Sequence, residues 1–128
     1  MEATDNSYSP YSKFRVGAAV RLSDGKIIKG ANQENAAFSV TICAERSAIF
    51  AAQANYPEQP VISIAIAARN EKGYTEEPIS PCGAGRQPMV EIEQKYSQPI
   101  RILKKKKKGV YVMDSIRNLM PLSFVDLN

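Results

Sequence analysis

The sequence predicts an α/β fold in which a sheet carries helices on both faces. Strand-like and helix-like segments alternate along the chain, an Asp-Gly pair joins two apolar runs, and residues 61–68 form a continuous apolar run. Strands that alternate with crossover helices give a sheet covered by helices. The 128 residues are enough for a real core, so we expect a single domain over residues 1–128.

The N-terminal half is predicted to contain a hairpin and then a helix. Residues 14–22 are expected to form a strand, Asp24-Gly25 the turn, and residues 26–31 the returning strand. Residues 41–54 are rich in Ala and Ile, which is typical of a helix that packs closely against a sheet. Thr41 is the predicted N-cap of this helix.

The C-terminal half is predicted to supply the centre of the sheet and a second helix. The apolar run at residues 61–68 indicates a buried central strand. Residues 83–96 have a helical pattern. Residues 100–103 and 109–113 are expected to be short strands, and Asp114 to cap a last short helix.

The charge of the chain is concentrated in one place. The formal net charge is +4, but five of the 17 basic residues are the lysines at positions 104–108. Because no aromatic residue interleaves them, they lack the stacking platform typical of single-strand binding. A solvated turn is favoured over a polyanion-binding patch, and we do not expect a nucleic-acid partner.

The cysteine and histidine counts restrict the chemistry. Two cysteines do not form a disulfide framework, and no apolar run reaches the length of a membrane span, so we expect a soluble protein in the thiol-reducing cytoplasm. The absence of histidine excludes His-based triads and His zinc ligands. A transition-metal site would therefore have to use thiolates and carboxylates.

Two short motifs could form such a site. Cys43-Ala44-Glu45 lies at the start of one predicted helix and Pro81-Cys82-Gly83-Ala84-Gly85 at the start of another. A helix N-terminus favours a thiolate, so the two cysteines could share a cation. Glu45 could move protons beside that cation without being a ligand. A lone cysteine is usually a small buried hydrophobe, and it is the combination that predicts a metal site.

These motifs resemble those of the zinc-dependent cytidine deaminase family. The matching stretches are Thr41-Ile42-Cys43-Ala44-Glu45-Arg46 and Ile79-Ser80-Pro81-Cys82-Gly83-Ala84, with an apolar strand between them. Further segments resemble the family in the same order: Tyr8-Ser9-Pro10-Tyr11-Ser12-Lys13-Phe14-Arg15-Val16-Gly17-Ala18-Ala19, Asn32-Gln33-Glu34-Asn35 and Leu119-Met120-Pro121-Leu122-Ser123-Phe124.

The resemblance implies hydrolytic deamination of free cytidine or deoxycytidine to uridine or deoxyuridine plus ammonia, in pyrimidine salvage. It also implies a three-layer fold with a mixed sheet of about five strands, a bound zinc ion, and a homotetramer with active sites near subunit contacts. The implied zinc ligands are Cys43 and Cys82, with Glu45 as the proton carrier and Arg46 as a donor to the ligand thiolates. The implied substrate-binding residues are Phe14 against the pyrimidine, Asn32 and Glu34 on the ribose, Ala44, and Phe124 reaching a neighbouring subunit's site. Alternatively, the two phenylalanines are core residues and Asn32 is a turn former.

The chain departs from the family pattern at three places. Gly85 stands where the family has its third zinc-ligand cysteine, so a substitute donor would have to be a carboxylate. Pro88 is expected to bend the following helix or delay its start. Only seven residues precede Tyr8, so the family's first helix is expected to be truncated. The alternative to an active deaminase is a catalytically silent relative that binds nucleosides at a defective zinc site.

Overall fold

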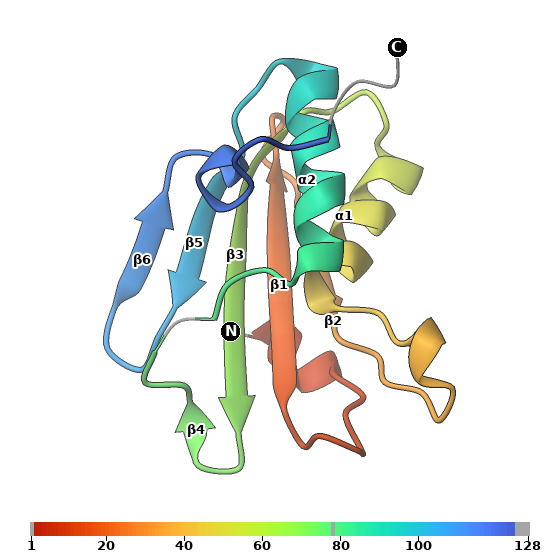
Figure 1. The fold of residues 1–128 in the computed structure, drawn as a ribbon, viewed down its shortest axis with the longest axis vertical. Helices are drawn as coiled ribbons and strands as arrows, with labels where there is room; N and C mark the ends of the chain where they lie inside the picture. The colour runs from red at the N-terminus through yellow and green to blue at the C-terminus, as the bar shows by residue number, and fades with distance from the viewer. Residues whose placement is uncertain (1, 78, 125–128) are drawn as a thin grey trace.

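The computed structural model describes residues 2–77 and 79–124 and shows a mixed sheet packed against two α-helices (Figure 1). The strands are β1 (Arg15–Leu22), β2 (Ile27–Ala31), β3 (Val61–Asn70), β4 (Gly73–Tyr74), β5 (Arg101–Lys105) and β6 (Val110–Met113). The helices are α1 (Ala44–Asn55) and α2 (Gly83–Tyr96), with the 3₁₀ turns η1 (Glu2–Asn6), η2 (Phe38–Val40) and η3 (Ile116–Leu119). The predicted α/β class is confirmed.

The sheet has the strand order β2-β1-β3-β5-β6, and β4 pairs with the end of β3. β1 is antiparallel to β2 and β3, β3 is parallel to β5, and β6 is antiparallel to β5. A parallel pair needs a crossover connection, and α2 provides it. The central position of β3 confirms the buried strand predicted at residues 61–68. The strand continues to Asn70 because its last two residues pair with β4, which the sequence did not predict.

Two glycines show which helices cover each face of the sheet. Gly30 on β2 lies against α1, where an added Cβ would be 2.4 Å from the backbone nitrogen of Ala48. Gly17 on β1 points to the opposite face, where an added Cβ would be 2.6 Å from the backbone nitrogen of Thr4 in η1. Both α-helices lie on the first face (Figure 1), and the helical layer of the other face consists of η1 among the residues described.

The hydrophobic core lies between the sheet and the two α-helices. Val20, Ile64 and Ile102 come from three neighbouring strands and Met89 from α2, and all four are fully buried. Ala44, Ala48 and Ala52 of α1 are also fully buried. Their small side chains let α1 approach the sheet closely, which fixes the position of the helix N-terminus.

Two predicted helix boundaries are wrong. Helix α1 begins at Ala44 with Cys43 as its N-cap, not with Thr41. The reason is that Ile42 exchanges two backbone hydrogen bonds with Gln33, so the chain is still extended there. The last short helix is the 3₁₀ turn η3, and its cap is Ser115 rather than Asp114, because the Ser115 hydroxyl accepts from the backbone nitrogen of Arg117.

Helix α2 has the predicted bounds and continues through Pro88. Because proline has no N–H to donate, this helix lacks one bond to the carbonyl of Ala84 without ending there. Cys82 is the N-cap of this helix, and Pro81 lies just outside it. Every helix in the described part of the chain is too short or too polar to cross a lipid bilayer.

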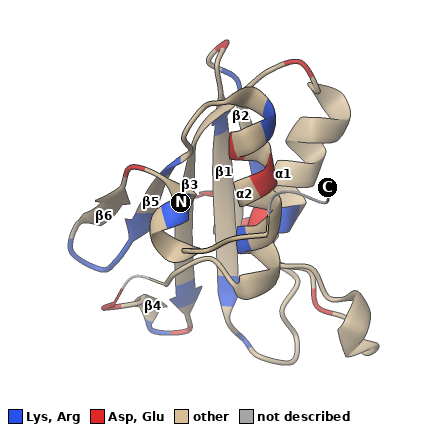
Figure 2. Ribbon diagram, turned by 45° about the horizontal axis from the view of Figure 1, so that its top comes forward, with Lys and Arg blue, Asp and Glu red and all other residues tan. Residues whose placement is uncertain are grey.

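The lysine run lies in the β5–β6 hairpin rather than wholly in a turn. Lys104 and Lys105 extend β5 and pair with Tyr111 and Val110, and only residues 106–109 form the connection. Figure 2 shows this connection as a blue loop at one edge of the sheet. The ammonium of Lys106 lies 4.5 Å from the ring centroid of Tyr111, so this lysine makes a cation–π contact within the hairpin.

Candidate metal centre and its cleft

The two cysteines lie together because the two α-helices begin at the same end of the sheet (Figure 1). Cys43 is the N-cap of α1 and Cys82 is the N-cap of α2. Glu45 lies in the first turn of α1. One donor atom from each of these three residues lies within 4.8 Å of the other two. Two sulfurs and a carboxylate at this spacing fit a zinc ion, which is held in proteins by Cys, His and Asp or Glu.

Glu45 connects the two helix starts. Its side chain is 3% exposed, and Oε2 accepts a hydrogen bond of 3.2 Å from the backbone nitrogen of Cys82. The carboxylate therefore crosses from α1 to the N-terminus of α2, where the exposed N–H groups favour a negative charge. This places a proton-accepting group within 4.8 Å of both sulfurs, at the wall of the cleft.

An arginine follows each cysteine by about one helical turn. Arg46 donates from Nε to the sulfur of Cys43 at 3.4 Å and from its terminal nitrogen to the carbonyl of Thr41 at 3.0 Å. Arg86 donates from Nε to the carbonyl of Pro81 at 2.7 Å and from its terminal nitrogen to the carbonyl of Leu119 at 3.0 Å. The sequence predicted the contact of Arg46 but missed the role of Arg86, although its spacing after Cys82 was a usable signal.

The structure corrects the expectation that both thiols favour the thiolate form. Burial raises the pKa of the Cys43 thiol to about 11, and the nearby charge of Glu45 adds to the effect. The hydrogen bonds involving Arg46 act in the opposite direction but are the weaker influence. With this pKa, Cys43 is a thiol at neutral pH when no metal ion is bound. A bound cation would make the coordinating sulfur ionise.

Gly85 is buried and lies directly against this site. A Cβ built on Gly85 would be 3.1 Å from Oε2 of Glu45 and 3.5 Å from the sulfur of Cys43. A side chain at position 85 would thus point toward the sulfur and the carboxylate. The interpretation of position 85 as a ligand position that has no ligand stays a prediction.

A cleft of about 290 Å³ opens beside the three donor atoms. Its lining contains most of the predicted site, namely Asn32, Glu34, Cys43, Ala44, Glu45, Arg46 and Cys82. The other lining residues are Val16, Thr41, Ile42, Ile79 and Ser80. Phe14 is half-buried just before β1 and Phe124 is exposed, and neither lines the cleft of the single chain.

Asn32 and Glu34 hold the loop that precedes β1. The Asn32 side chain accepts from the backbone nitrogen of Val16 and donates to the carbonyl of Phe14, both at 3.0 Å. Glu34 accepts from the backbone nitrogens of Tyr11 and Ser12. A hydrogen bond from the Ser12 hydroxyl is the main reason that the pKa of Glu34 lies below its usual value. Both residues thus shape the cleft wall.

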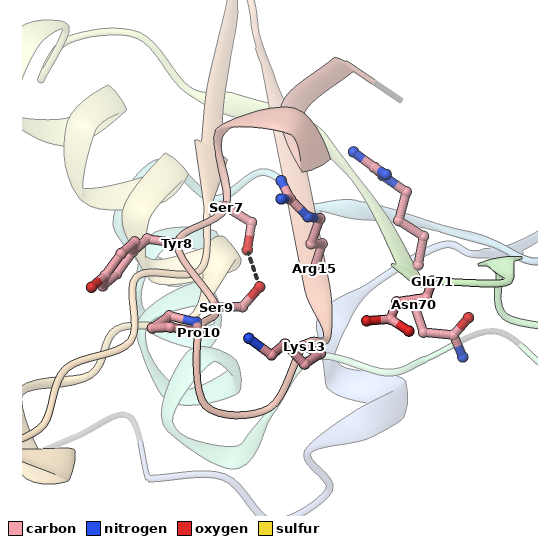
Figure 3. A pocket seen from close by; sticks show the side chains of 9 residues that line it. Ser7, Tyr8, Ser9, Pro10, Lys13, Arg15, Asn70 and Glu71 are labelled. Carbon is pink, nitrogen blue, oxygen red and sulfur yellow. Dashed lines mark hydrogen bonds between the residues drawn. The ribbon is translucent and has the colours of Figure 1, made fainter.

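A second cavity, of about 450 Å³, lies at the other side of the same loop (Figure 3). It is lined by polar and charged side chains, including Lys13, Arg15, Arg69 and Glu71. Arg69 is already paired with Asp5. Neither thiol lines this cavity, so it is not the candidate metal centre.

The chain is similar in sequence to known deaminases. The sequence model of the family described as "Cytidine and deoxycytidylate deaminase zinc-binding region" matches residues 1–97. The cytidine deaminase of Halalkalibacterium halodurans is 45% identical over 92 residues, which is 72% of this chain and 65% of that protein. That of Sporosarcina psychrophila is 45% identical over 91 residues, 71% of this chain and 62% of that protein. The matches thus span slightly less than two thirds of these curated relatives.

The fold has close counterparts among solved structures. The crystal structure of cytidine deaminase from Burkholderia pseudomallei superposes with a TM-score of 0.81 at 37% identity, over 95% of this chain and 91% of that one. The crystal structure of cytidine deaminase from Mycobacterium tuberculosis superposes with a TM-score of 0.73 at 26% identity, over 96% and 89% of the two chains. These superpositions cover nearly the whole chain, whereas the matched family region ends at residue 97.

Proposed function

Because the chain belongs to the cytidine and deoxycytidylate deaminase family, we propose that it hydrolyses free cytidine or deoxycytidine to uridine or deoxyuridine and ammonia. The observation that carries this proposal is the convergence of the two cysteine sulfurs and the Glu45 carboxylate within 4.8 Å, beside a cleft. The cleft is of the size that accepts a small organic ligand.

Cys43 and Cys82 would hold the zinc ion, which supplies Lewis-acid activation of the water that attacks the base. Glu45 accepts a proton from the attacking water while the water oxygen adds to C4 of the pyrimidine. Glu45 then delivers this proton to N3. The C4–N4 bond then breaks, and the second proton of the water passes through Glu45 to the departing amine, which leaves as ammonia. Proton transfer by a positioned carboxylate contributes about 10²–10⁴-fold to the rate.

The other predicted site residues would bind the nucleoside. We propose that Ala44 faces the base, and that Asn32 and Glu34 face the ribose hydroxyls from the cleft wall that they also hold together. Phe14 would reach the pyrimidine by a rotation of its side chain. Phe124, whose backbone carbonyl accepts from Gln87 at 2.7 Å, would contribute to the site of a neighbouring subunit in a homotetramer.

Assembly fits the distribution of apolar side chains. Phe38, Leu122 and Phe124 are large apolar residues left exposed on the single chain, and contact with other subunits would cover them. Light scattering after size-exclusion chromatography gives the mass of the assembly.

We also propose a cytoplasmic location, because the site needs both cysteines as free thiols.

The test uses zinc-supplemented protein with cytidine or deoxycytidine. We expect loss of the cytidine absorbance with an equal amount of ammonia released, and we expect Glu45→Gln to abolish turnover while the far-ultraviolet circular dichroism stays unchanged. A Glu76→Gln variant, with an exposed carboxylate outside the cleft, serves as the matched control. Turnover that persists in Glu45→Gln would contradict the assignment of Glu45.

A second candidate function follows from Gly85. The chain could be a silent relative that binds nucleosides without hydrolysing them, because its site has one thiolate fewer than the family pattern. Zinc-supplemented protein that binds cytidine in calorimetry yet releases no ammonia would support this candidate. Zinc content of about one per chain together with turnover would exclude it.

A further inference from the structure

We propose that, in the substrate-free protein, Glu45 is the third zinc ligand of this chain and takes the place of the side chain that Gly85 lacks. The inference rests on the proposed function, because it concerns the zinc ion that this deaminase would use. It goes beyond that function by giving the proton-carrying carboxylate a second role, which a site with three thiolates does not need.

The space beside Gly85 supports this role. The atom nearest to a Cβ built on Gly85 is Oε2 of Glu45, at 3.1 Å, and the sulfur of Cys43 follows at 3.5 Å. A third sulfur carried by residue 85 would therefore start from a Cβ beside the Cys43 sulfur and the Glu45 carboxylate. Because Gly85 leaves that space open, the carboxylate can enter it without displacing another side chain.

The state of the Glu45 side chain points to a cation as well. The side chain is 3% exposed, yet among the described residues its carboxylate accepts a single hydrogen bond, from the backbone nitrogen of Cys82. A buried carboxylate normally has several donors or a cation as partners. Arg46, the nearest arginine along the helix, is engaged with Cys43 and Thr41.

The charge of the site leads to the same assignment. Zinc with two thiolates has a net charge of zero, and a carboxylate ligand brings it to −1, the charge that three thiolates would give. Zinc sites normally contain three or four protein ligands, and Glu oxygen is an ordinary one. The other carboxylate that lines the cleft belongs to Glu34, whose oxygens already accept from Tyr11 and Ser12. The chain contains no histidine.

The experiment measures zinc affinity without substrate, by competition with a chromophoric chelator under reducing conditions. The proteins are the natural chain, Glu45→Gln, Gly85→Cys, and the double variant. In the natural background, Glu45→Gln should weaken zinc binding about tenfold or more. In the Gly85→Cys background a thiolate is available as third ligand, so Glu45→Gln should lower zinc affinity by less than about threefold. The difference between the losses in the two backgrounds is the coupling of a double-mutant cycle.

Two controls separate ligation from other effects. Gly85→Ala adds the Cβ without the sulfur, so it should not reproduce the gain in zinc affinity expected for Gly85→Cys. Glu34→Gln removes the same charge from the cleft wall and should change zinc affinity by less than about threefold if ligation rather than overall charge matters. Circular dichroism of each variant verifies that the fold is intact.

Equal losses of zinc affinity from Glu45→Gln in both backgrounds would overturn the inference. The outcome is independent of turnover, because the titration contains no nucleoside. A protein that shows the coupling but releases no ammonia would contradict the proposed function alone. A protein that turns over cytidine but shows no coupling would contradict the ligand role alone. Ligation and proton transfer are then alternative states of one carboxylate, the first without substrate and the second with it.

Discussion

Gly30 of β2 and Ala48 of α1 lie so close that an added Cβ on Gly30 would be 2.4 Å from the Ala48 backbone nitrogen and 2.8 Å from the Ala44 carbonyl. Both neighbours are backbone atoms, which cannot move aside by a rotamer change. The contact fixes the first turns of α1 on the sheet and with them the positions of Cys43 and Glu45.

Gly30→Ala should therefore displace α1 and destabilise the protein. Overpacking of this kind typically costs about 1–3 kcal/mol. Urea unfolding followed by circular dichroism measures the loss. Gly83→Ala is the matched control, because nothing lies within 4 Å of an added Cβ there. An unfolding free energy that falls equally in both variants would contradict the role given to the close approach of α1 and β2.

A second prediction concerns the buried carboxylate of Glu93 in α2. It accepts from the backbone nitrogens of Ile100 and Ile116 at 2.7 and 3.0 Å, and from the hydroxyl of Ser115. Glu93→Gln leaves Oε1 to accept from both backbone nitrogens, but it replaces Oε2, which faces Nε of Arg117 at 3.7 Å, by an amide donor and removes the buried charge that this arginine pairs with. We expect a loss of about 1–3 kcal/mol in the free energy of unfolding.

The control for Glu93 is Glu91→Gln, which makes the same change at an exposed position of α2. Its unfolding midpoint in urea should stay near that of the natural chain. If the two variants unfold alike, the hydrogen bonds of Glu93 contribute nothing measurable to stability.

Local signals were sufficient to predict the parts of the site that depend on short sequence spacing. Cys43 and Glu45 lie two residues apart in the chain, so their proximity follows from the short sequence separation. Residues 61–68 predicted the central strand because a continuous apolar run is typical of a strand buried on both faces. These features depend on neighbours in the chain, which the sequence displays directly.

Features that depend on distant contacts were not predictable. The bridge between Ile42 and Gln33 keeps residues 41–43 extended, and it moves the helix start away from Thr41. The raised pKa of Cys43 results from burial and from the Glu45 charge, which outweigh the helix N-terminus on which the sequence argument relied. Such effects require the packing around the residue, and spacing alone does not reveal them.

The raised pKa of Cys43 leads to a prediction for zinc-free protein. After chelation of zinc, iodoacetamide should modify the exposed Cys82 at least about tenfold faster than Cys43 at pH 8, because the thiolate is the reacting form. Modification of Cys43 should rise with pH, reach half its maximum near the pKa of about 11 and level off only above it. Mass spectrometry of tryptic peptides measures both rates, and equal rates at pH 8 would contradict the assigned burial.

The same shift gives the protein a pH-dependent stability. With a pKa raised in the folded chain from the ordinary 9.0 to about 11, the folded state keeps a proton that the unfolded state loses in this range. The free energy of unfolding of the zinc-free protein should therefore fall as the pH rises from about 9 to about 11. Cys43→Ser should reduce this slope, which urea unfolding at several pH values can measure.

The last prediction concerns Arg46, which joins the sulfur of Cys43 to the carbonyl of Thr41. Donors of this kind orient a ligand and stabilise its charge, and their loss typically costs about 10–100-fold in metal affinity. Arg46→Ala should weaken zinc binding by that factor, whereas Arg101→Ala, at an exposed position on β5, should leave it unchanged. Arg46→Lys should recover only part of the loss, because an ammonium supplies charge but cannot span both partners with one planar group. Full recovery by lysine would show that charge alone accounts for the effect of Arg46.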